Sequence, residues 1–250
     1  MHSVDVGDMF NIQSKKITLL ISGFCLALVS FAQNPYAYSS KNMPDYDARK
    51  LHYGFSIGLN NSRYSIIHSD YFVANRDSIK AVTPLGTTSF TLGFIGNYHI
   101  NDVMDLRILM DVGFYNRNVQ YTFKEGTFPK LGELPLQQIE STIIEMPLLF
   151  KYKSVRHKNF RVYVVGGVKP GVEINNKKKL NRESILRVRP ADMALEYGIG
   201  FDIYYPMFKF SPEIRFSHGL PNLLVPDDNV FANSVQRVSS HTITLFFHFE

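Results

Sequence analysis

The chain has 250 residues, of which 27 are Lys or Arg, 22 are Asp or Glu, 20 are Phe, 14 are Tyr and one is Cys. This apolar and aromatic content is too high for a disordered chain, and a single cysteine can build neither a disulfide framework nor a cysteine-based zinc site. The formal net charge of +5 could suggest nucleic-acid binding, but that requires a basic motif, and none is present. We therefore expect one domain of ordinary size and no nucleic-acid partner.

The chain opens with a segment typical of a secretory signal peptide. An apolar run at 17–31 follows two lysines, and small residues occupy the third-last and last positions before a cleavage site after Ala32. The competing interpretation, a membrane anchor, needs roughly 20 apolar residues, more than this run supplies. A lipoprotein signal would need a small residue before Cys25, where the chain has a phenylalanine. We therefore expect 1–32 to be an over-extended start plus a cleaved signal peptide, without a lipid anchor.

Eight later segments alternate between apolar and polar residues. In the first of them, Leu51, Tyr53 and Phe55 are separated by polar or small residues. A period of two places the apolar side chains on one face of a strand, whereas a helix would scatter them. The sequence therefore predicts eight strands of roughly ten residues each, a common length for barrel strands. Their ranges are 51–60, 89–98, 106–115, 144–153, 160–173, 195–203, 208–216 and 242–249.

Short and long connections alternate between these strands. Short ones fall at 101–104, 154–159 and 205–207. The others are longer, as are the external loops of an up-and-down antiparallel barrel of the bacterial outer membrane, whose periplasmic turns are short. We therefore predict an all-β fold, an eight-stranded antiparallel up-and-down transmembrane β-barrel over 50–250, located in the cell outer membrane. Residues 33–49 would then be a periplasmic N-terminal segment.

Alternation alone does not fix which face points inward, because a soluble lipocalin-like barrel has the same period with its apolar face inside. Tyr53, Tyr98, Tyr152 and Tyr205 lie near strand ends on the apolar face, where interfacial aromatic girdles belong. Charges of both signs lie on the opposite face, and this favours a membrane barrel with a polar lumen. We expect them to form a closed ion-pair network, with a proton or solute pathway as the alternative. The candidate residues are Arg107, Asp111, Glu145, Lys151, Arg161, Glu196, Asp202, Glu213 and Arg215.

Most of the basic surplus falls in one predicted external loop, at 174–192. The loop carries six basic residues against Glu183 and Asp192, so it holds +4 of the formal +5. Such a loop could bind lipopolysaccharide phosphates or an acidic partner, and the alternative is a solvated loop without a ligand. The six basic residues are Lys177, Lys178, Lys179, Arg182, Arg187 and Arg189.

An enzyme is the weaker interpretation of the polar residues. Ser239 and His241 lie on one face near the external end of the last strand, with His218 on its neighbour, and a serine beside a histidine is the start of a hydrolytic site. No carboxylate occupies an orienting position. The remaining histidines lack metal-ligand spacing, and no nucleotide-binding loop is present. We therefore expect no catalytic, metal or cofactor site and no cofactor.

Distinctive segments lie at 50–60, 139–153, 164–168 and 208–219, and the chain closes with further ones at 231–234 and 247–250. Together these segments, which span nearly the whole mature chain, resemble the PorT family of outer-membrane proteins of Bacteroidetes. The segment at 145–152 alone is less specific, since many small barrels carry something similar. The resemblance implies an outer-membrane component needed for type IX protein secretion.

The expected size of the barrel limits what such a component can do. An eight-stranded barrel is just wide enough to be filled by side chains, so it cannot conduct folded cargo. We therefore expect an accessory or assembly component, with outer-membrane lipid, lipopolysaccharide and other secretion-system proteins as candidate partners. The alternatives are a small surface-binding or adhesion barrel and an outer-membrane lipid hydrolase.

Overall fold

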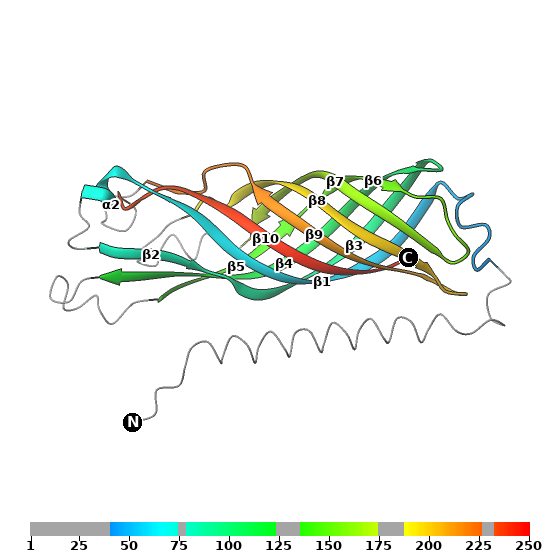
Figure 1. Ribbon diagram of the computed structural model, residues 1–250, viewed down its shortest axis with the longest axis horizontal. Coiled ribbons are helices and arrows are strands. Elements are labelled where there is room, and N and C mark those ends of the chain that lie inside the picture. The colour runs from blue at the N-terminus through cyan, green and yellow to red at the C-terminus, as the bar shows by residue number, and fades with distance from the viewer. Residues whose placement is uncertain (1–40, 75–78, 124–135, 175–187, 227–232) are drawn as a thin grey trace, which may run out of the picture. The chain divides into compact units, whose positions relative to one another are not determined.

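The structure is a computed structural model that describes residues 41–74, 79–123, 136–174, 188–226 and 233–250. In these ranges it contains ten β-strands and one short helix (Figure 1). None of the described helical residues forms a helix long and apolar enough to cross a membrane. The elements are β1 (Leu51–His68), α2 (Asp70–Ala74), β2 (Ile79–Leu85), β3 (Thr87–Asn101), β4 (Met104–Phe123), β5 (Leu136–Glu145), β6 (Leu148–Lys153), β7 (Phe160–Glu173), β8 (Ala191–Tyr204), β9 (Lys209–Gly219) and β10 (Val235–Phe249).

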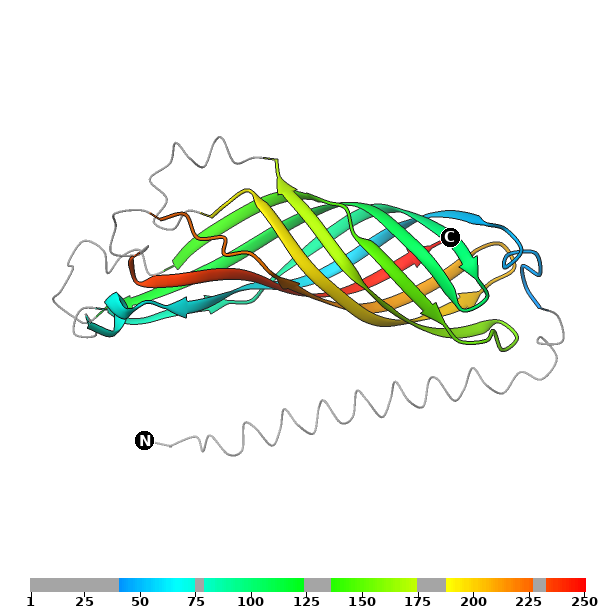
Figure 2. The ribbon, with the colours of Figure 1, turned by 90° about the horizontal axis from the view of Figure 1, so that it is seen from above.

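The strands close into a barrel with eight positions around its wall, and each position is called a stave. β1 pairs with β3 on one side and with β10 on the other, and β10, β9, β8 and β7 follow in antiparallel order. Two staves are each built from two strands: β2 and β3 both pair with β4, and β5 and β6 both lie between β4 and β7. The predicted eight-stranded antiparallel barrel is therefore confirmed (Figure 2).

A proline explains one of the two places where a stave is divided into two strands. Pro147 separates β5 from β6 and has no backbone N–H to give to a ladder. Its carbonyl still accepts a hydrogen bond from the Leu109 N–H at 3.0 Å. The stave therefore continues past the interruption, and it appears as one alternating segment in the sequence.

The prediction of roughly ten residues per strand is wrong for the longest strands. β1 has 18 residues and β4 has 20. Ladder pairing of β1 with β10 continues from Phe55 to His68, but beyond Leu59 the outward positions are the polar Asn61 and Arg63. The alternation that marks the strand in sequence therefore ends before the strand does. Both long strands extend toward the long-loop end of the barrel.

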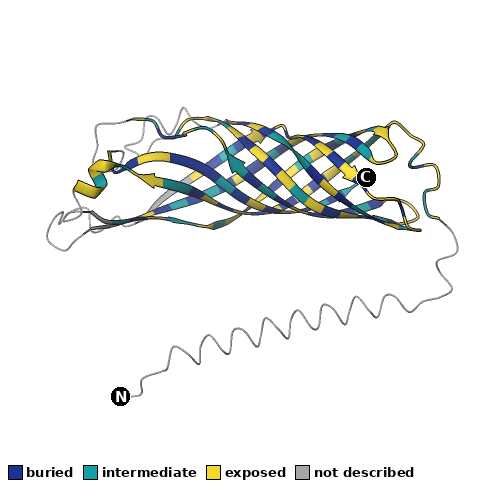
Figure 3. Ribbon diagram, turned by 45° about the horizontal axis from the view of Figure 1, so that its top comes forward, coloured by how far each residue is buried: buried dark blue, intermediate teal, exposed yellow. Residues whose placement is uncertain are grey.

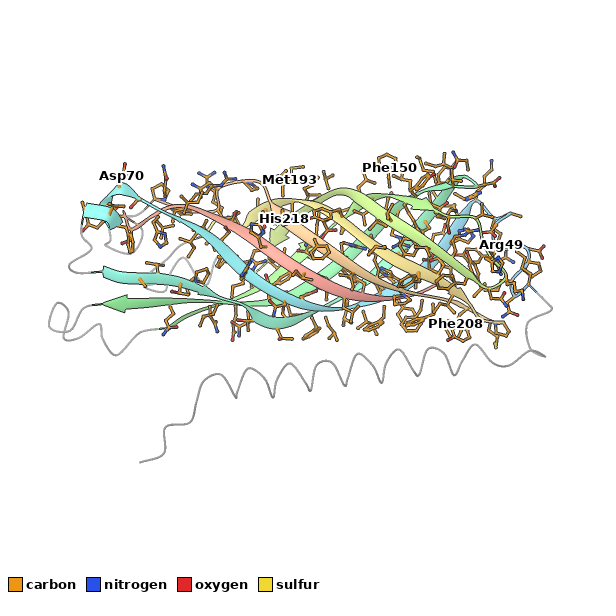
Figure 4. All side chains as sticks on the ribbon, in the orientation of Figure 1. Arg49, Asp70, Phe150, Met193, Phe208 and His218 are labelled. Atoms are coloured by element: carbon orange, nitrogen blue, oxygen red, sulfur yellow. The ribbon has the colours of Figure 1, made fainter. Side chains whose placement is uncertain are left out.

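The apolar face of the strands points outward. Phe94 and Met110 are 72% and 56% exposed, whereas the lumen-facing Leu109 is 1% exposed. The alternation of exposed and buried positions runs around the whole wall in Figure 3. Phe150 and Met193 lie on the same outer surface (Figure 4). This inverts the pattern of a soluble protein, because lipid requires apolar side chains outside.

A small apolar core fills the inside of the barrel at its long-loop end. Leu223 and Leu224, which follow β9, pack against inward-facing side chains of the extended strands. The Leu223 N–H donates to the Val238 carbonyl at 2.8 Å, which fixes this segment against β10. The core consists of Tyr64, Val82, Val119, Leu223, Leu224, Val235 and Val238. The alternation in the sequence does not predict this core, because it marks apolar residues that face outward.

Candidate functional site: the charges of the lumen

The centre of the lumen holds a carboxylate between two arginines. Glu213 on β9 accepts Arg107 Nη1 from β4 at 2.7 Å and Arg215 Nη2 from its own strand at 2.5 Å. Arg215 Nε donates to the same carboxylate at 2.8 Å. All three side chains are at most 1% exposed. β4 and β9 lie on opposite sides of the ring of strands, so this contact crosses the lumen.

A second carboxylate, that of Glu250, closes the network toward the short-turn end. It accepts Lys209 Nζ at 3.0 Å and Asn97 Nδ2 at 2.5 Å, and it lies 3.6 Å from Arg107 Nη2. The Tyr46 hydroxyl donates to it at 3.0 Å and accepts Lys209 Nζ at 2.7 Å. Burial, with the nearby Glu250 charge, raises the pKa of Tyr46 well above its usual value. The hydroxyl therefore keeps the proton that it donates.

Lys151 and Asp202 form a compact pair beside the central group. Lys151 Nζ lies 2.8 Å from each carboxylate oxygen of Asp202, and Ser211 Oγ donates to the same carboxylate at 2.7 Å. Lys151 extends from β6 across β7 to reach β8, with its Nζ 3.7 Å from the centre of the Tyr163 ring. Both charged side chains are at most 1% exposed.

A third group lies one level nearer the long loops. Lys169 Nζ lies 3.0 Å from Glu145 and 3.3 Å from Glu196. Glu196 also accepts Arg215 Nη1 at 3.3 Å, which joins this group to the central one. Tyr115 donates its hydroxyl to Glu145 at 2.9 Å. Seven of the nine residues that the sequence singles out thus lie in these three groups of ion pairs, with Lys169 and Lys209 as further members.

The other two candidates lie outside these ion pairs. Asp111 is fully buried, yet Ser56 Oγ donates to its Oδ1 only at 3.4 Å, and its Oδ2 has no partner among the described residues. Arg161 lies at the short-turn end of β7, where its guanidinium pairs with Asp47 at 3.1 Å. Parity places both residues in the lumen correctly but does not give their height along the barrel, which decides which charges can meet.

The segment at 42–50 covers the short-turn end of the barrel, a contact that no sequence pattern indicates. Arg156 donates to the backbone carbonyls of Asn42 and Met43, and Asn42 Nδ2 donates to the Tyr204 carbonyl at 3.0 Å. The Tyr46 ring stacks on His52 with ring centres 3.9 Å apart. No alternation marks this segment, so its packing could not be predicted.

The predicted basic loop lies almost wholly outside the described residues. Only Arg189 is described: its side chain is exposed and its backbone N–H donates to the Leu223 carbonyl at 2.8 Å. The other five basic residues, Lys177, Lys178, Lys179, Arg182 and Arg187, lie outside the described residues. Whether the loop binds phosphate therefore stays a prediction.

The serine and histidines of the enzyme hypothesis do not meet as a nucleophile and its base. His218 Nδ1 lies 2.8 Å from His241 Nδ1, and the Tyr197 hydroxyl lies 2.9 Å from His218 Nε2. Where the structure describes the chain, Ser239 makes no hydrogen bond to either histidine. The described residues also contain no group of three or more His, Cys, Asp or Glu able to hold a metal ion.

A closed barrel with an apolar exterior and a charged, side-chain-filled interior defines an integral outer-membrane protein. The comparison with protein families agrees with this class. The chain belongs to the family described as "Outer membrane protein beta-barrel domain", whose sequence model matches residues 31–225. The predicted location in the outer membrane is thereby confirmed.

Solved outer-membrane barrels resemble the chain at low identity. Neisserial surface protein A has 11% identity and a TM-score of 0.40, over 80% of this chain and 98% of that one. The attachment invasion locus protein Ail of Yersinia pestis has 14% identity and a TM-score of 0.36, over 80% and 98%. OprG of Pseudomonas aeruginosa has 14% identity and a TM-score of 0.37, over 78% and 92%. Among curated proteins, none matches this chain.

Proposed function

We propose that this protein is a non-enzymatic accessory or assembly component of type IX protein secretion. The support from sequence is the resemblance of 50–60, 139–153 and 208–219 to the PorT family of Bacteroidetes. These segments correspond to β1, the β5–β6 stave and β9, which are spread around the barrel. The resemblance therefore concerns the whole barrel wall and not one hairpin.

The observation that carries the accessory role is the filled lumen. Arg107, Lys151, Tyr163 and Glu213 are all at most 1% exposed and meet near the middle of the barrel. A barrel of eight strands has room for these side chains and for little else. Folded cargo has to pass through another component, so this protein acts through its outer wall or its two ends.

The non-enzymatic part of the proposal rests on the geometry of Ser239 and His241. A hydrolytic serine needs a base within hydrogen-bond reach and a group that orients the base. Here the two histidines contact each other, and the group that contacts His218 from the other side is a tyrosine. Replacing Ser239 and His241 together by Ala should leave secretion intact.

The direct test is a clean deletion in the native host, scored for proteins that carry the type IX export signal. These proteins should disappear from the medium and cell surface and reappear with the wild-type gene. An outer-membrane protein assembled by another route serves as the control and should be unaffected. Normal export in the deletion strain would refute the proposal, and loss of surface attachment with export intact would favour an adhesion barrel.

A further inference from the structure

The barrel wall has a break in its hydrogen-bond ladder between β3 and β4. Pairing of these strands ends at Phe90 and Phe114, and pairing of β2 with β4 begins only at Leu85 and Asn118. Between these points, residues 87–89 pair with β1 alone and residues 115–117 pair with β5 alone. The two edges face each other there without a shared ladder.

A depression of about 330 Å³ lies at this break. Its apolar part is formed by Phe90 and Phe114, whose rings stack with centres 4.8 Å apart and are 45% and 41% exposed to the outside. The next outward residues toward the long loops are Thr88 and Asn116, which also line it. The depression therefore crosses the border between the apolar belt and the polar outer rim, the depth at which a lipid chain meets its headgroup.

Polar atoms beside the depression lack partners. Asn116 Oδ1, in a residue that lines the depression from the outer face, is buried without a hydrogen-bond partner among the described residues, and so is Asn118 Oδ1 at the next outward position of β4. Ser89 Oγ is in the same state, but its parity with Thr91 turns it toward the lumen. A buried polar group without a partner is destabilising, so each of the two amide oxygens favours a ligand that donates a hydrogen bond to it. Rotation about the Cβ–Cγ bond of Asn116, a soft torsion, can turn its amide toward a donor in the depression.

An arginine closes the lumenal side of the break. Arg117 Nε donates to Ser62 Oγ on β1 at 2.8 Å, and its guanidinium lies 4.7 Å from the centre of the Tyr115 ring and 5.1 Å from that of Tyr64. Its side chain is buried, so it spans from β4 past the edge of β3 to β1. The depression is therefore accessible from the membrane side, and a ligand would enter it from the bilayer.

We propose that this break is a binding site for a membrane lipid with a hydroxyl-bearing headgroup, such as a glycolipid. The acyl chain would pack along Phe90 and Phe114, while headgroup hydroxyls would donate to the amide oxygens of Asn116 and Asn118. Choline headgroups offer no O–H or N–H donor, so the site should discriminate against them. Two recovered hydrogen bonds correspond to a preference of about tenfold, since each 1.4 kcal/mol is tenfold.

The test uses the absence of tryptophan from the chain. Met110→Trp places a single fluorophore on the outer wall of β4, six residues below Asn116 and about 20 Å along the strand, beside the middle of the bound acyl chain. The mature protein is refolded into phosphatidylcholine vesicles whose acyl chains carry bromine, which quenches the fluorescence. Unbrominated glucosyl diacylglycerol of the same chain length is then titrated in. Phe94→Trp, at the cross-strand partner of Met110, serves as a second reporter.

Ile214→Trp is the control. Ile214 lies on β9, on the opposite side of the barrel, is 45% exposed, and contacts lipid at a part of the wall that lacks the depression. Quenching at Met110→Trp should be relieved at a glycolipid fraction about tenfold lower than at Ile214→Trp, because a bound lipid excludes brominated ones. Adding Asn116→Leu with Asn118→Leu should abolish the difference. Equal relief at the two walls, or a difference that survives removal of both polar side chains, would overturn the proposal.

Discussion

Asp202→Asn should be among the most destabilising single changes in the lumen. The substitution keeps the shape of the side chain but leaves Lys151 without its counter-charge. Because the Lys151 side chain is 0% exposed, neither water nor lipid headgroups can replace that charge. Removing one partner of such a buried pair costs about 3–5 kcal/mol. Asp47→Asn is the control: Asp47 pairs with Arg161 at 3.1 Å and lies 3.6 Å from Arg156, but its side chain is 29% exposed, so water reaches these pairs and the loss should be smaller.

The free energy of unfolding can be measured by urea titration in phospholipid vesicles, with the folded fraction read from gel mobility without heating. A double-mutant cycle with Lys151→Met isolates the interaction of the pair. The double variant should lose roughly 2–4 kcal/mol less than the two single variants added together, because it leaves no unpaired buried charge. If Asp202→Asn cost no more than Asp47→Asn, or if the two single effects simply added, the argument for a desolvated pair would be refuted.

Three further outcomes follow from the facing of the strands. Ile108→Arg or Ile199→Arg should each cost roughly 2–4 kcal/mol in the same urea titration, since both side chains face lipid; tolerance of both would mean that the assigned face is inverted. Gly200→Ala should destabilise the barrel, because a Cβ there would lie 2.5 Å from the Tyr163 ring, whereas Gly166→Ala, with its nearest atom at 3.9 Å, should be neutral; equal effects would contradict the crowded lumen. The protein should fractionate with outer membranes and show heat-modifiable migration, and recovery from the soluble periplasm would contradict the membrane fold.

The fold could be predicted from the sequence because lipid restricts every outward position of a strand. Residues such as Ile57 and Leu92 must be apolar over the full height of the belt, and this produces an alternation that no helix shares. The same constraint explains where the prediction stopped. Beyond the belt, β1 faces water with Asn61 and Arg63, and its strand conformation there depends on ladder pairing that the sequence does not display.

For the lumenal site, the sequence predicts only which side of the barrel wall each side chain faces. Parity places Arg107, Asp111 and Glu213 inside, but their partners depend on the stagger between staves and on closure of the ring. Arg107 and Glu213 are 106 residues apart in the chain and still meet at 2.7 Å. Asp111, with the same parity as Arg107, meets no cation in an ion pair among the described residues.

The distribution of side chains inside the barrel limits where any function can lie. At the short-turn end Tyr46 covers the lumen, in the middle the charged groups around Glu213 fill it, and at the long-loop end Leu223 packs into an apolar core. Apart from Asp111, the charged groups that the sequence singles out in the middle pair with groups of opposite sign, which is the arrangement of structural ion pairs, whereas a solute pathway would need groups that exchange partners with a passing ion. The outer wall and the two ends are therefore the surfaces on which a partner or a lipid can act.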